Sequence, residues 1–327
     1  MSVLVAIVNY RTADLVRGCL ESLAPERALA GDVRAVVVDN DSGDGSATTL
    51  EAFIGAAGYS DWARVVRLPR NGGFAFGNNA AWRASLESGF RPRYVFWLNP
   101  DTLVRSGAIL RLIEWMDAHP EAGIAGSSQE DGAGVEVPSA HRFPSLLGEF
   151  QRGARLGLAD RWLKPVGPGA GEPRRVDWVS GAAIMARAEV VEQLGGMDEG
   201  FFLYFEEVDF CRRAARAGWH VWQVPGSRIV HLEGSATGIA SAGRRRGRYW
   251  FDSRRRYLVK HLSVFGLLAA DVLWLIGHVS LAARRLLGLC GHDQTNPRLF
   301  AWDLLWGDAR ALLTLRVPIF TSDGRAS

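Results

Sequence analysis

The sequence is poor in cysteine. Its 327 residues include three, Cys19, Cys211 and Cys290, which lie far apart. This number and spacing exclude a disulfide framework and a cysteine-based metal motif, as expected of a protein from a reducing cytosol. The chain also lacks a strong charge of one sign. Its formal net charge of +3 argues against a molecule that binds nucleic acid over its whole surface.

Long uninterrupted apolar runs are scarce as well. The residues from Met1 to Val8 show no basic segment and no small-residue cleavage site, so we expect no signal peptide and a buried strand at 3–8. The most apolar late stretch, 262–283, is interrupted by Asp271 and His278. It falls short of the roughly 20 apolar residues that a membrane-spanning helix needs, so we expect no such helix.

The first hundred residues alternate between apolar runs and helical patterns. This alternation indicates a mostly parallel, doubly wound sheet. Ligands bind at the carboxyl ends of the strands in such sheets, so the loops that follow them are the first candidates for a site. We predict strands at 3–8, 33–39, 64–68 and 94–98, and helices at 12–23, with Thr12 as the N-cap, and from 74 to about 88.

The later part of the chain is less regular. Residues 126–175 are rich in glycine and proline, which predicts a long excursion over the surface. A strand at 177–185, a helix that begins near Glu206, and short strands at 219–224 and 228–231 are predicted to follow. From residue 244 onward the chain is expected to be helical, first basic and then apolar.

Three carboxylates, Glu206, Glu207 and Asp209, lie among aromatic and apolar side chains near the start of that predicted helix. Ionised carboxylates avoid apolar surroundings unless something stabilises them there. The positive end of the helix dipole would lie beside Glu206 and Glu207 and keep them ionised. An ionised carboxylate in an apolar setting is suited to act as a general base, so an enzyme is the leading interpretation.

Two candidate metal ligands lie at strand ends. Asp101 follows the strand at 94–98 within the turn Asn99-Pro100-Asp101, and His231 ends the strand at 228–231. A hard cation such as Mg²⁺ takes one or two carboxylates together with substrate phosphates. The alternatives stay open, because Asn-Pro-Asp is also ordinary turn chemistry and a lone histidine is usually structural.

A glycine-rich loop, Arg70-Asn71-Gly72-Gly73-Phe74, leads into the helix that carries Asn78 and Asn79. Its glycines would let backbone N–H groups approach an anion near the positive end of that helix. The loop lacks the lysine of a P-loop and the spacing of a dinucleotide fingerprint. An ordinary strand-to-helix turn is the alternative.

Further polar and aromatic residues lie beside these loops. Asp39 could accept hydrogen bonds from a nucleobase or ribose, and the turn Asn9-Tyr10-Arg11 could border the same base. The alternative for Asp39 is a capping role in a turn. Trp178, in a strand with Ser180 and Gly181, could stack on a sugar, although such a tryptophan is more often part of the core.

Arginine is concentrated between residues 244 and 256, where it alternates with aromatic residues, and an apolar stretch at 262–287 follows. Nucleic-acid binding, an anionic membrane surface and a solvated helix face would each explain this pattern. Each Lys or Arg near an anionic membrane contributes about 1 kcal/mol, and the apolar stretch follows directly, so we favour peripheral membrane association.

Together these motifs resemble the family 2 glycosyltransferases of the GT-A fold, in particular the rhamnosyltransferase-like branch that builds bacterial cell-surface polysaccharides. The resemblance implies a catalytic domain at 1–235, with a Rossmann-like, mostly parallel sheet flanked by helices, and a helical C-terminal region at 236–327. It rests on motifs that occur in the family's order, namely Ile7–Tyr10, Val38–Ser42, Arg70–Phe74, Gly77–Asn79, Leu98–Asp101, Phe201–Arg212 and His231.

The resemblance also implies roles for single residues. Asp101 matches the last carboxylate of the family's Asp-x-Asp metal motif, in which Asn99 replaces the first, and His231 would complete the shell of Mg²⁺ or Mn²⁺. Glu206 and Glu207 match the acidic pair, whose second member is the usual base. The candidate acceptor residues are Trp178, Ser180 and Gly181, and the candidate donor residues are Asn9, Tyr10, Arg11, Asp39, Asn71, Gly72, Gly73, Phe74, Asn78, Asn99 and Asp101.

The function implied is an inverting, metal-dependent transfer of a sugar from a nucleotide diphosphate, with dTDP-L-rhamnose as the expected donor. The expected acceptor is a saccharide, free or linked to polyprenyl diphosphate. The alternatives are a UDP-sugar donor carrying N-acetylglucosamine, galactose or galactofuranose, and a non-catalytic sugar-binding protein. We expect a cytoplasmic enzyme without a nucleic-acid partner, in peripheral contact with the inner membrane through residues 244–287.

Overall fold

The computed structural model describes residues 2–156, 171–232, 245–290 and 296–314. The chain separates into two compact units. The first comprises residues 1–142, 165–202 and 206–238, and the second comprises 143–164, 203–205 and 239–327. The boundary predicted between residues 235 and 236 lies outside the described residues and stays a prediction.

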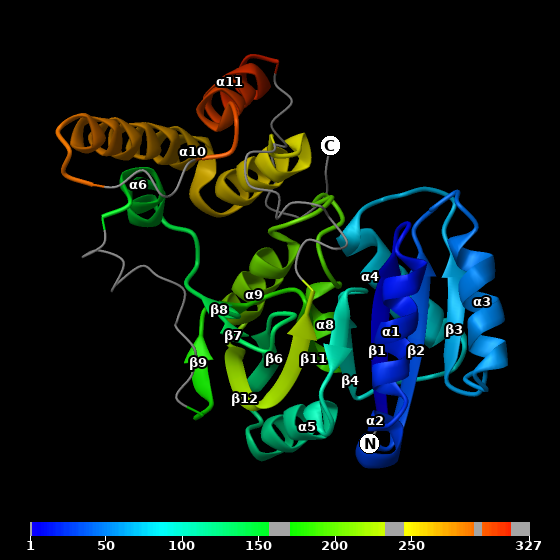
Figure 1. The fold of residues 1–327 in the computed structure, drawn as a ribbon. Coiled ribbons are helices and arrows are strands. Elements are labelled where there is room, and N and C mark those ends of the chain that lie inside the picture. The colour runs from blue at the N-terminus through cyan, green and yellow to red at the C-terminus, as the bar shows by residue number, and fades with distance from the viewer. Residues whose placement is uncertain (1, 157–170, 233–244, 291–295, 315–327) are drawn as a thin grey trace. The chain divides into compact units, whose positions relative to one another are not determined.

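The first unit is built on a mixed ten-stranded sheet (Figure 1). Its main path has the strand order β3-β2-β1-β4-β11-β6-β12-β5. The first four strands of this path are parallel, which confirms the prediction from the apolar runs. They are β1 (Ser2–Asn9), β2 (Asp32–Asp39), β3 (Ala63–Arg67) and β4 (Tyr94–Leu98).

Helices cover both faces of these parallel strands, which is why the strands are continuous apolar runs. Ile7 of β1 belongs to one core with Leu20 and Leu112 from helices on one face. On the other face Gly77 approaches Val8 so closely that a Cβ there would lie 2.8 Å from the valine methyl carbons. The helices of this unit are α1 (Ala13–Leu23), α2 (Glu26–Ala30), α3 (Ser46–Ala56), α4 (Phe74–Glu87), α5 (Ala108–Ala118), α8 (Ala188–Leu194) and α9 (Glu206–Arg216).

The second half of the sheet mixes directions. β11 runs antiparallel to both of its neighbours, β4 and β6. β12 pairs in parallel with β6 and antiparallel with β5. These strands are β5 (Thr102–Val104), β6 (Ala122–Glu130), β7 (Glu136–Val137), β9 (Arg174–Val176), β11 (Ala183–Arg187) and β12 (His220–His231). A separate two-stranded sheet joins β8 (Ala140–His141) to β10 (Trp178–Val179).

The surface excursion predicted at 126–175 is wrong at its start, because β6 is a fully buried strand of the sheet. Its small and polar residues lack the alternation of a half-buried strand. The glycines of β6 are explained by its packing, because a side chain at either position would collide with a neighbouring residue. A Cβ on Gly123 would lie 2.7 Å from Trp219, and one on Gly126 would lie 2.6 Å from Val179.

Two other predicted strand assignments also differ from the structure. The strand predicted at 177–185 is two strands, β10 and β11, separated by residues 180–182. The two short strands predicted at 219–224 and 228–231 form one strand, β12, with a register shift between Val224 and Arg228. Pro225 lies within this shift, where a proline does not remove a regular ladder hydrogen bond.

The second unit is helical, as predicted for the region after residue 244. It contains α6 (Leu146–Ala154), α10 (Arg248–Leu286) and α11 (Phe300–Leu313). Helix α10 is interrupted at Ser263, whose φ of 71° and ψ of 175° are not helical, so it consists of two helical segments. The hydrophobic core of this unit includes Trp250, Trp274 and Phe300.

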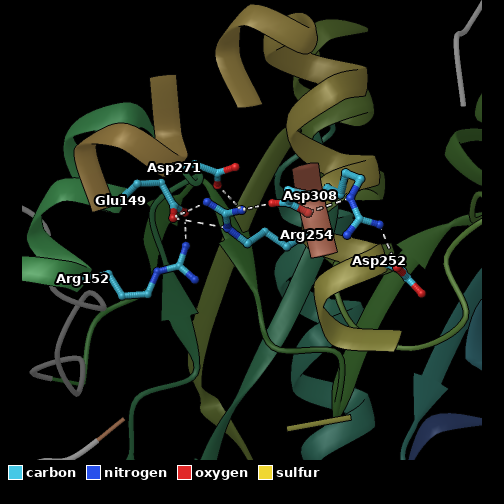
Figure 2. Close-up of polar contacts among 7 residues, drawn as sticks. Glu149, Arg152, Asp252, Arg254, Asp271 and Asp308 are labelled. Carbon is cyan, nitrogen blue, oxygen red and sulfur yellow. Dashed lines mark hydrogen bonds and ion pairs between the residues drawn. The ribbon is translucent and has the colours of Figure 1, made fainter. Parts of the chain in front are cut away.

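A buried ion-pair network links α6, α10 and α11, the helices in the described part of this unit (Figure 2). Arg254 contacts Glu149 at 2.9 Å, Asp271 at 2.9 Å and Asp308 at 3.1 Å, and Arg255 contacts Asp308 at 2.6 Å. Arg254 and Arg255 are therefore interior residues. The favoured membrane-surface interpretation of the arginine cluster is wrong for both, as are the solvated-face and nucleic-acid alternatives.

Helix α10 is long and apolar enough to cross a membrane, with a mean hydropathy of 1.8 over its most apolar window. The shortfall of apolar length predicted for this region is thus wrong, whereas the expectation of no membrane-spanning helix stays a prediction. One third of that window is buried within the fold. Membrane helices and core helices share this length and hydropathy and differ in which of their side chains are exposed.

Candidate active site

The parallel register brings the predicted strand-end residues together at one edge of the sheet. Asn9 at the end of β1 lies opposite Asp39 at the end of β2, and Asp39 lies opposite Arg67 of β3. Ile7 of β1 lies opposite Leu98, the last residue of β4. The loops that follow these strands therefore begin side by side, as the sequence predicted.

Asp39 is held in a fixed orientation by neighbouring residues. Asn9 Nδ2 donates to its Oδ1 at 2.7 Å, and Ser42 donates through its hydroxyl to Oδ1 at 2.6 Å and through its backbone N–H to Oδ2 at 3.2 Å. Asn9 Oδ1 in turn accepts from Thr12 N and Thr12 Oγ1. Thr12 occupies the N-cap position of α1, as predicted, but its side chain makes no capping hydrogen bond, and the side chain that accepts hydrogen bonds at this helix start is Asn9.

Tyr10 and Arg11 extend from this edge. The Tyr10 side chain is exposed, and the Arg11 guanidinium carbon lies 5.1 Å from the centroid of its ring. Arg11 has a positive φ of 59°, and its Nε donates to the carbonyl oxygen of Ser42 at 2.9 Å. An exposed aromatic ring beside a fixed carboxylate is a suitable surface for a nucleobase.

Asn40 links the glycine-rich loop after β3 to the end of β2, and no role was predicted for this residue from the sequence. Asn40 Nδ2 donates to Asn71 Oδ1 at 2.9 Å and to the carbonyl oxygen of Gly73 at 3.0 Å, and Asn40 Oδ1 accepts from Gly72 N at 3.3 Å. The sequence signal that could have identified Asn40 is its position in a turn directly after Asp39. The Phe74 N–H donates to the Phe202 carbonyl at 2.7 Å, which links the loop to the segment before the acidic helix.

The two asparagines of α4 differ in role. Asn79 is structural, because its side chain exchanges hydrogen bonds with the backbone of Met197 at 2.9 and 2.8 Å. Asn78 is fully buried and donates to the Phe74 carbonyl at 3.1 Å, and its Oδ1 has no hydrogen-bond partner among the described residues. The donor-binding role of Asn78 stays a prediction.

Gly73 should be intolerant of a side chain. Its φ is 90°, and an added Cβ would lie 2.1 Å from the Phe202 carbonyl oxygen. We expect Gly73→Ala to raise the KM for the predicted donor about tenfold or more, since a displacement of about 1 Å in a binding loop can have a 10²-fold effect. The control is Gly89→Ala, with a φ of 79° and nothing within 4 Å of the added Cβ. Equal KM values in steady-state assays of the two variants would contradict this expectation.

Asp101, His231 and Asn99 come together from two separate segments. Asp101 follows β4, and His231 ends β12 opposite Thr102 of β5. His231 Nε2 lies 3.3 Å from Asp101 Oδ1 and 3.4 Å from Asn99 Nδ2. Asp101 is almost completely buried. The structure therefore brings the two predicted metal ligands into direct contact.

The side chains of Asp101 and His231 suit a divalent cation for which the protein supplies only some of the ligands. A carboxylate oxygen and an imidazole nitrogen both suit Mn²⁺, and Mg²⁺ is bound by one or two carboxylates with substrate phosphates and water. Among the described residues, no group of three or more His, Cys, Asp or Glu side chains could hold a metal ion. The remaining ligands would come from a bound diphosphate and water.

The acidic pair at the start of α9 is asymmetric. Glu206 is only 4% exposed, and its Oε2 has no hydrogen-bond partner among the described residues. Burial, together with the neighbouring charge of Glu207, raises the pKa of Glu206 well above its ordinary value. Desolvation thus opposes the helix dipole at Glu206 and disfavours its ionised form, contrary to the direction expected from the dipole alone. Glu207 is partly exposed.

The third carboxylate of the acidic segment is structural. Asp209 is fully buried, and Arg213 Nε donates to its Oδ2 at 2.7 Å. The same guanidinium donates to the carbonyl oxygens of Leu194 and Gly196. Asp209 therefore fixes the first turn of α9 and leaves the two glutamates as the candidates for chemistry.

Gly181 lies directly against Glu207. An added Cβ at Gly181 would be 3.6 Å from the side-chain carbons of Glu207, and Ser180 N donates to the Ser139 carbonyl at 2.9 Å. The Trp178 ring stacks on His141 with centroids 4.2 Å apart, and its indole N–H donates to the Arg142 carbonyl. One face of Trp178 is thus occupied, and its sugar contact stays a prediction.

One short segment connects the acidic pair to the metal-ligand pair. Asn99 N donates to the Ala182 carbonyl at 3.0 Å, and Gly181, the preceding residue, packs against Glu207. In addition, Trp97 of β4 contacts Phe210 of α9, with ring centroids 4.9 Å apart. The carboxyl end of β4 and the start of α9 are therefore neighbours, with residues 181 and 182 between them.

Two sequence profiles match most of the chain. Residues 2–178 match glycosyl transferase family 2, and residues 94–313 match glycosyl transferase family group 2. Two curated relatives are rhamnosyltransferases. One is the N-acetylglucosaminyl-diphospho-decaprenol L-rhamnosyltransferase of Mycobacterium tuberculosis, which is 31% identical over 44% of this chain and 48% of its own. The other is the rhamnosyltransferase WbbL of Escherichia coli, which is 26% identical over 49% of this chain and 60% of its own.

The match thus spans about half the length of these curated relatives. Among solved structures, a mannosyltransferase from Pyrobaculum calidifontis in complex with GDP-Man and Mn²⁺ aligns with a TM-score of 0.53, 19% identity, 95% of this chain and 80% of its own. TarS 1–349 of S. aureus aligns with a TM-score of 0.51, 14% identity, 97% of this chain and 82% of its own. These likenesses concern the fold. By sequence profile and fold, this chain belongs to glycosyl transferase family 2 and has the GT-A architecture.

Proposed function

We propose that this protein transfers L-rhamnose from dTDP-L-rhamnose to a saccharide linked to polyprenyl diphosphate, with inversion at the anomeric carbon. The observation that carries the proposal is the position of residues 181–182 between the two functional pairs. Ala182 accepts a hydrogen bond from Asn99 N, two residues before Asp101, and an added Cβ on Gly181 would lie 3.6 Å from Glu207, while Asp101 itself lies beside His231. A group that binds diphosphate and a group that accepts a proton are required on the two sides of the reacting carbon. The names of the rhamnosyltransferase relatives support the choice of sugar and acceptor.

In this proposal Glu207 is the general base. It removes the proton from an acceptor hydroxyl while that oxygen forms a bond to the anomeric carbon. The bond from the anomeric carbon to the diphosphate oxygen breaks on the opposite side, and dTDP leaves with the bonding electrons. The proton remains on Glu207. Because attack and departure are in line, the product has the opposite anomeric configuration to the donor.

Glu206 supports this role by its own protonation state. Two adjacent ionised carboxylates repel each other, and the more buried one gives up its charge first. Glu206 is the buried member, with a raised pKa, and Glu207 is the partly exposed member. The raised pKa of Glu206 concentrates the negative charge of the pair on Glu207, the residue beside Gly181.

Asp101 and His231 would hold Mg²⁺ or Mn²⁺. When bound there, such an ion would neutralise charge on the departing diphosphate as a Lewis acid. Asn99, whose amide nitrogen lies 3.4 Å from His231 Nε2, borders this site. On the nucleotide side, Asp39 has lone pairs beyond those used by Asn9 and Ser42, so it can accept from a ribose hydroxyl or a base N–H.

A lipid-linked acceptor resides in a membrane. We therefore propose that the enzyme is cytoplasmic and works at the cytoplasmic face of the inner membrane. The donor is water-soluble and would reach the site from the cytosol.

The donor and the stereochemistry are tested together in one assay. The full chain is incubated with Mn²⁺, a synthetic N-acetylglucosaminyl-diphospho-polyprenol and, in separate reactions, dTDP-L-rhamnose and UDP-linked N-acetylglucosamine, galactose and galactofuranose. We expect transfer from dTDP-L-rhamnose and an inverted linkage by NMR. Transfer from a UDP-sugar alone, or a retained configuration, would overturn the proposal.

The metal pair gives a separate expectation. Asp101→Asn and His231→Ala should each lower activity by about 10²-fold or more, because a bound ion supplies several kcal/mol of charge stabilisation. Both variants should also lose the rise in melting temperature that Mn²⁺ with dTDP gives the wild type. Asp61→Asn, in a surface pair with Arg27, is the matched control. Full activity of Asp101→Asn at wild-type Mn²⁺ concentrations would contradict the assignment.

A further inference from the structure

The second segment of α10, after Ser263, is apolar on opposite faces. One face is buried and includes Leu267, Trp274 and Leu281. The other face is exposed although its side chains are equally apolar, with Phe265 at 83% as the extreme. A helix that is apolar all round normally has both faces covered. The exposed residues, spaced three or four apart for most of their length, are Phe265, Leu268, Val272, Leu275, Ile276, Val279 and Leu286.

The buried face is occupied by α6 at unusually short range. A Cβ on Gly153 of α6 would lie 2.2 Å from the Trp274 carbonyl, and one on Gly277 of α10 would lie 2.3 Å from the Phe150 carbonyl. Backbones that approach this closely leave no room for another partner. Whatever covers the exposed face must therefore approach from the side opposite α6.

The ion-pair network argues against a helix that spans the membrane. Asp271 of the same segment contacts Arg254, which also contacts Glu149 and Asp308 (Figure 2). A transmembrane position would place these charges and the attached helix α6 in the hydrocarbon core, which is costly. An orientation parallel to the membrane plane buries only the exposed face and leaves the network within the protein.

Helix α11 carries a second exposed apolar face. Trp302 is 60% exposed and Trp306 is 53% exposed, and their rings stack with centroids 5.7 Å apart. Leu299 and Leu313 are exposed at the two ends of the same helix. Tryptophan is enriched where proteins meet the interface between lipid and water, because its ring is apolar and its N–H is polar.

The charges around these two faces favour an anionic partner. In the described part of residues 264–314, the carboxylates Asp271, Asp303 and Asp308 each contact an arginine. Arg298 and Arg310 are exposed beside the apolar side chains of α11. The accessible charge on this surface is therefore positive, which complements anionic lipid headgroups.

We propose that the exposed faces of α10 (residues 265–286) and α11 form a docking surface for an anionic lipid membrane, on which both helices lie in the interfacial plane. This surface deepens the function proposed above, since a lipid-linked acceptor is presented at such a membrane. Lipid binding itself requires no donor, metal or acceptor, so it is measured independently of transfer.

The test is vesicle flotation of the full chain in a density gradient. Vesicles of phosphatidylcholine are compared with vesicles that also contain phosphatidylglycerol. We expect the wild type to float with the anionic vesicles and to be released by alkaline carbonate. Val272→Glu combined with Ile276→Glu should lower the bound fraction about tenfold or more, because it places two charges on the exposed face that would enter the membrane interface. Leu147→Glu, at an exposed leucine of α6, should float as the wild type does.

Three results would overturn the docking surface. The first is unchanged flotation of the Val272→Glu/Ile276→Glu variant. The second is resistance of the wild type to carbonate, which would indicate a spanning helix. The third is a lipid-free dimer that the same double substitution dissociates in light scattering, which would make a second copy of the chain the occupant. Loss of flotation with normal transfer to a water-soluble acceptor would separate this surface from the catalytic site.

Discussion

Replacing Glu207 by glutamine should lower kcat by about 10²–10⁴-fold, the range for loss of a general base. Glutamine keeps the size of the side chain and its contact with Gly181, and removes only the capacity to accept a proton at the carboxylate. Donor binding should remain within about twofold of the wild type, because the nucleotide-side residues Asn9, Asp39 and Asn40 are untouched. Single-turnover kinetics with equilibrium dialysis of labelled donor would separate the two effects.

The matched variant is Glu206→Gln. Glu206 is buried and its pKa is raised, so burial penalises the charged form, and an uncharged amide avoids that penalty. We expect a loss of about tenfold or less, together with a simpler acid limb in the pH profile of kcat/KM, because a coupled pair has become a single titrating group. A greater loss in Glu206→Gln than in Glu207→Gln would assign the base to Glu206.

Replacing Arg254 by methionine should destabilise the second unit by about 3–5 kcal/mol, the usual effect of breaking a buried ion pair by removing one partner. Arg254 is fully buried and contacts Glu149, Asp271 and Asp308, so its loss leaves these carboxylates with less compensation in the interior. Hydrogen exchange of residues 248–313 would report on this unit alone. Arg248→Met is the control, because the Arg248 side chain is 85% exposed.

The effect should depend on pH in a defined direction. Burial and the charge of Asp271 raise the pKa of Asp308 from 3.8 to about 7, and burial also raises the pKa of Asp271. A raised carboxyl pKa stabilises the folded state fully below its unfolded value, and this contribution is lost as the pH rises through the folded value. Without Arg254 both carboxyls will protonate more readily. The difference from wild type should therefore be smaller at pH 5 than at pH 8, and a difference that does not change with pH would contradict this account.

The parallel part of the sheet could be predicted because its strands carry a strong local signal. β1, β2 and β4 are apolar along most of their length, since helices cover both of their faces. The neighbouring positions of Asn9, Asp39 and Asp101 followed from topology alone, because parallel strands end at the same edge. The contact between Asp101 and His231 could be predicted for the same reason, because both residues follow or end a strand at that edge.

Other features depend on contacts that the local sequence does not encode. β6 is a buried strand built from small residues, because Gly123 and Gly126 each make room for a bulky neighbour. A search for apolar periodicity does not detect such a strand. The raised pKa of Glu206 comes mainly from its burial. An argument from the helix dipole alone does not include this effect. Arg254 and Arg255 belong to a charged segment whose interior position is set by carboxylates on α6 and α11, more than 50 residues away.

The hydrogen bonds around Asp39 have a consequence for the thermodynamics of ligand binding. Asn9, Asp39 and Asn40 are each buried and held in one rotamer by partners within the protein. Their conformational entropy is therefore lost when the chain folds, and a nucleotide that arrives later does not have to order them. The binding free energy at this edge of the sheet is left to direct contacts and to the release of water, as in a rigid template.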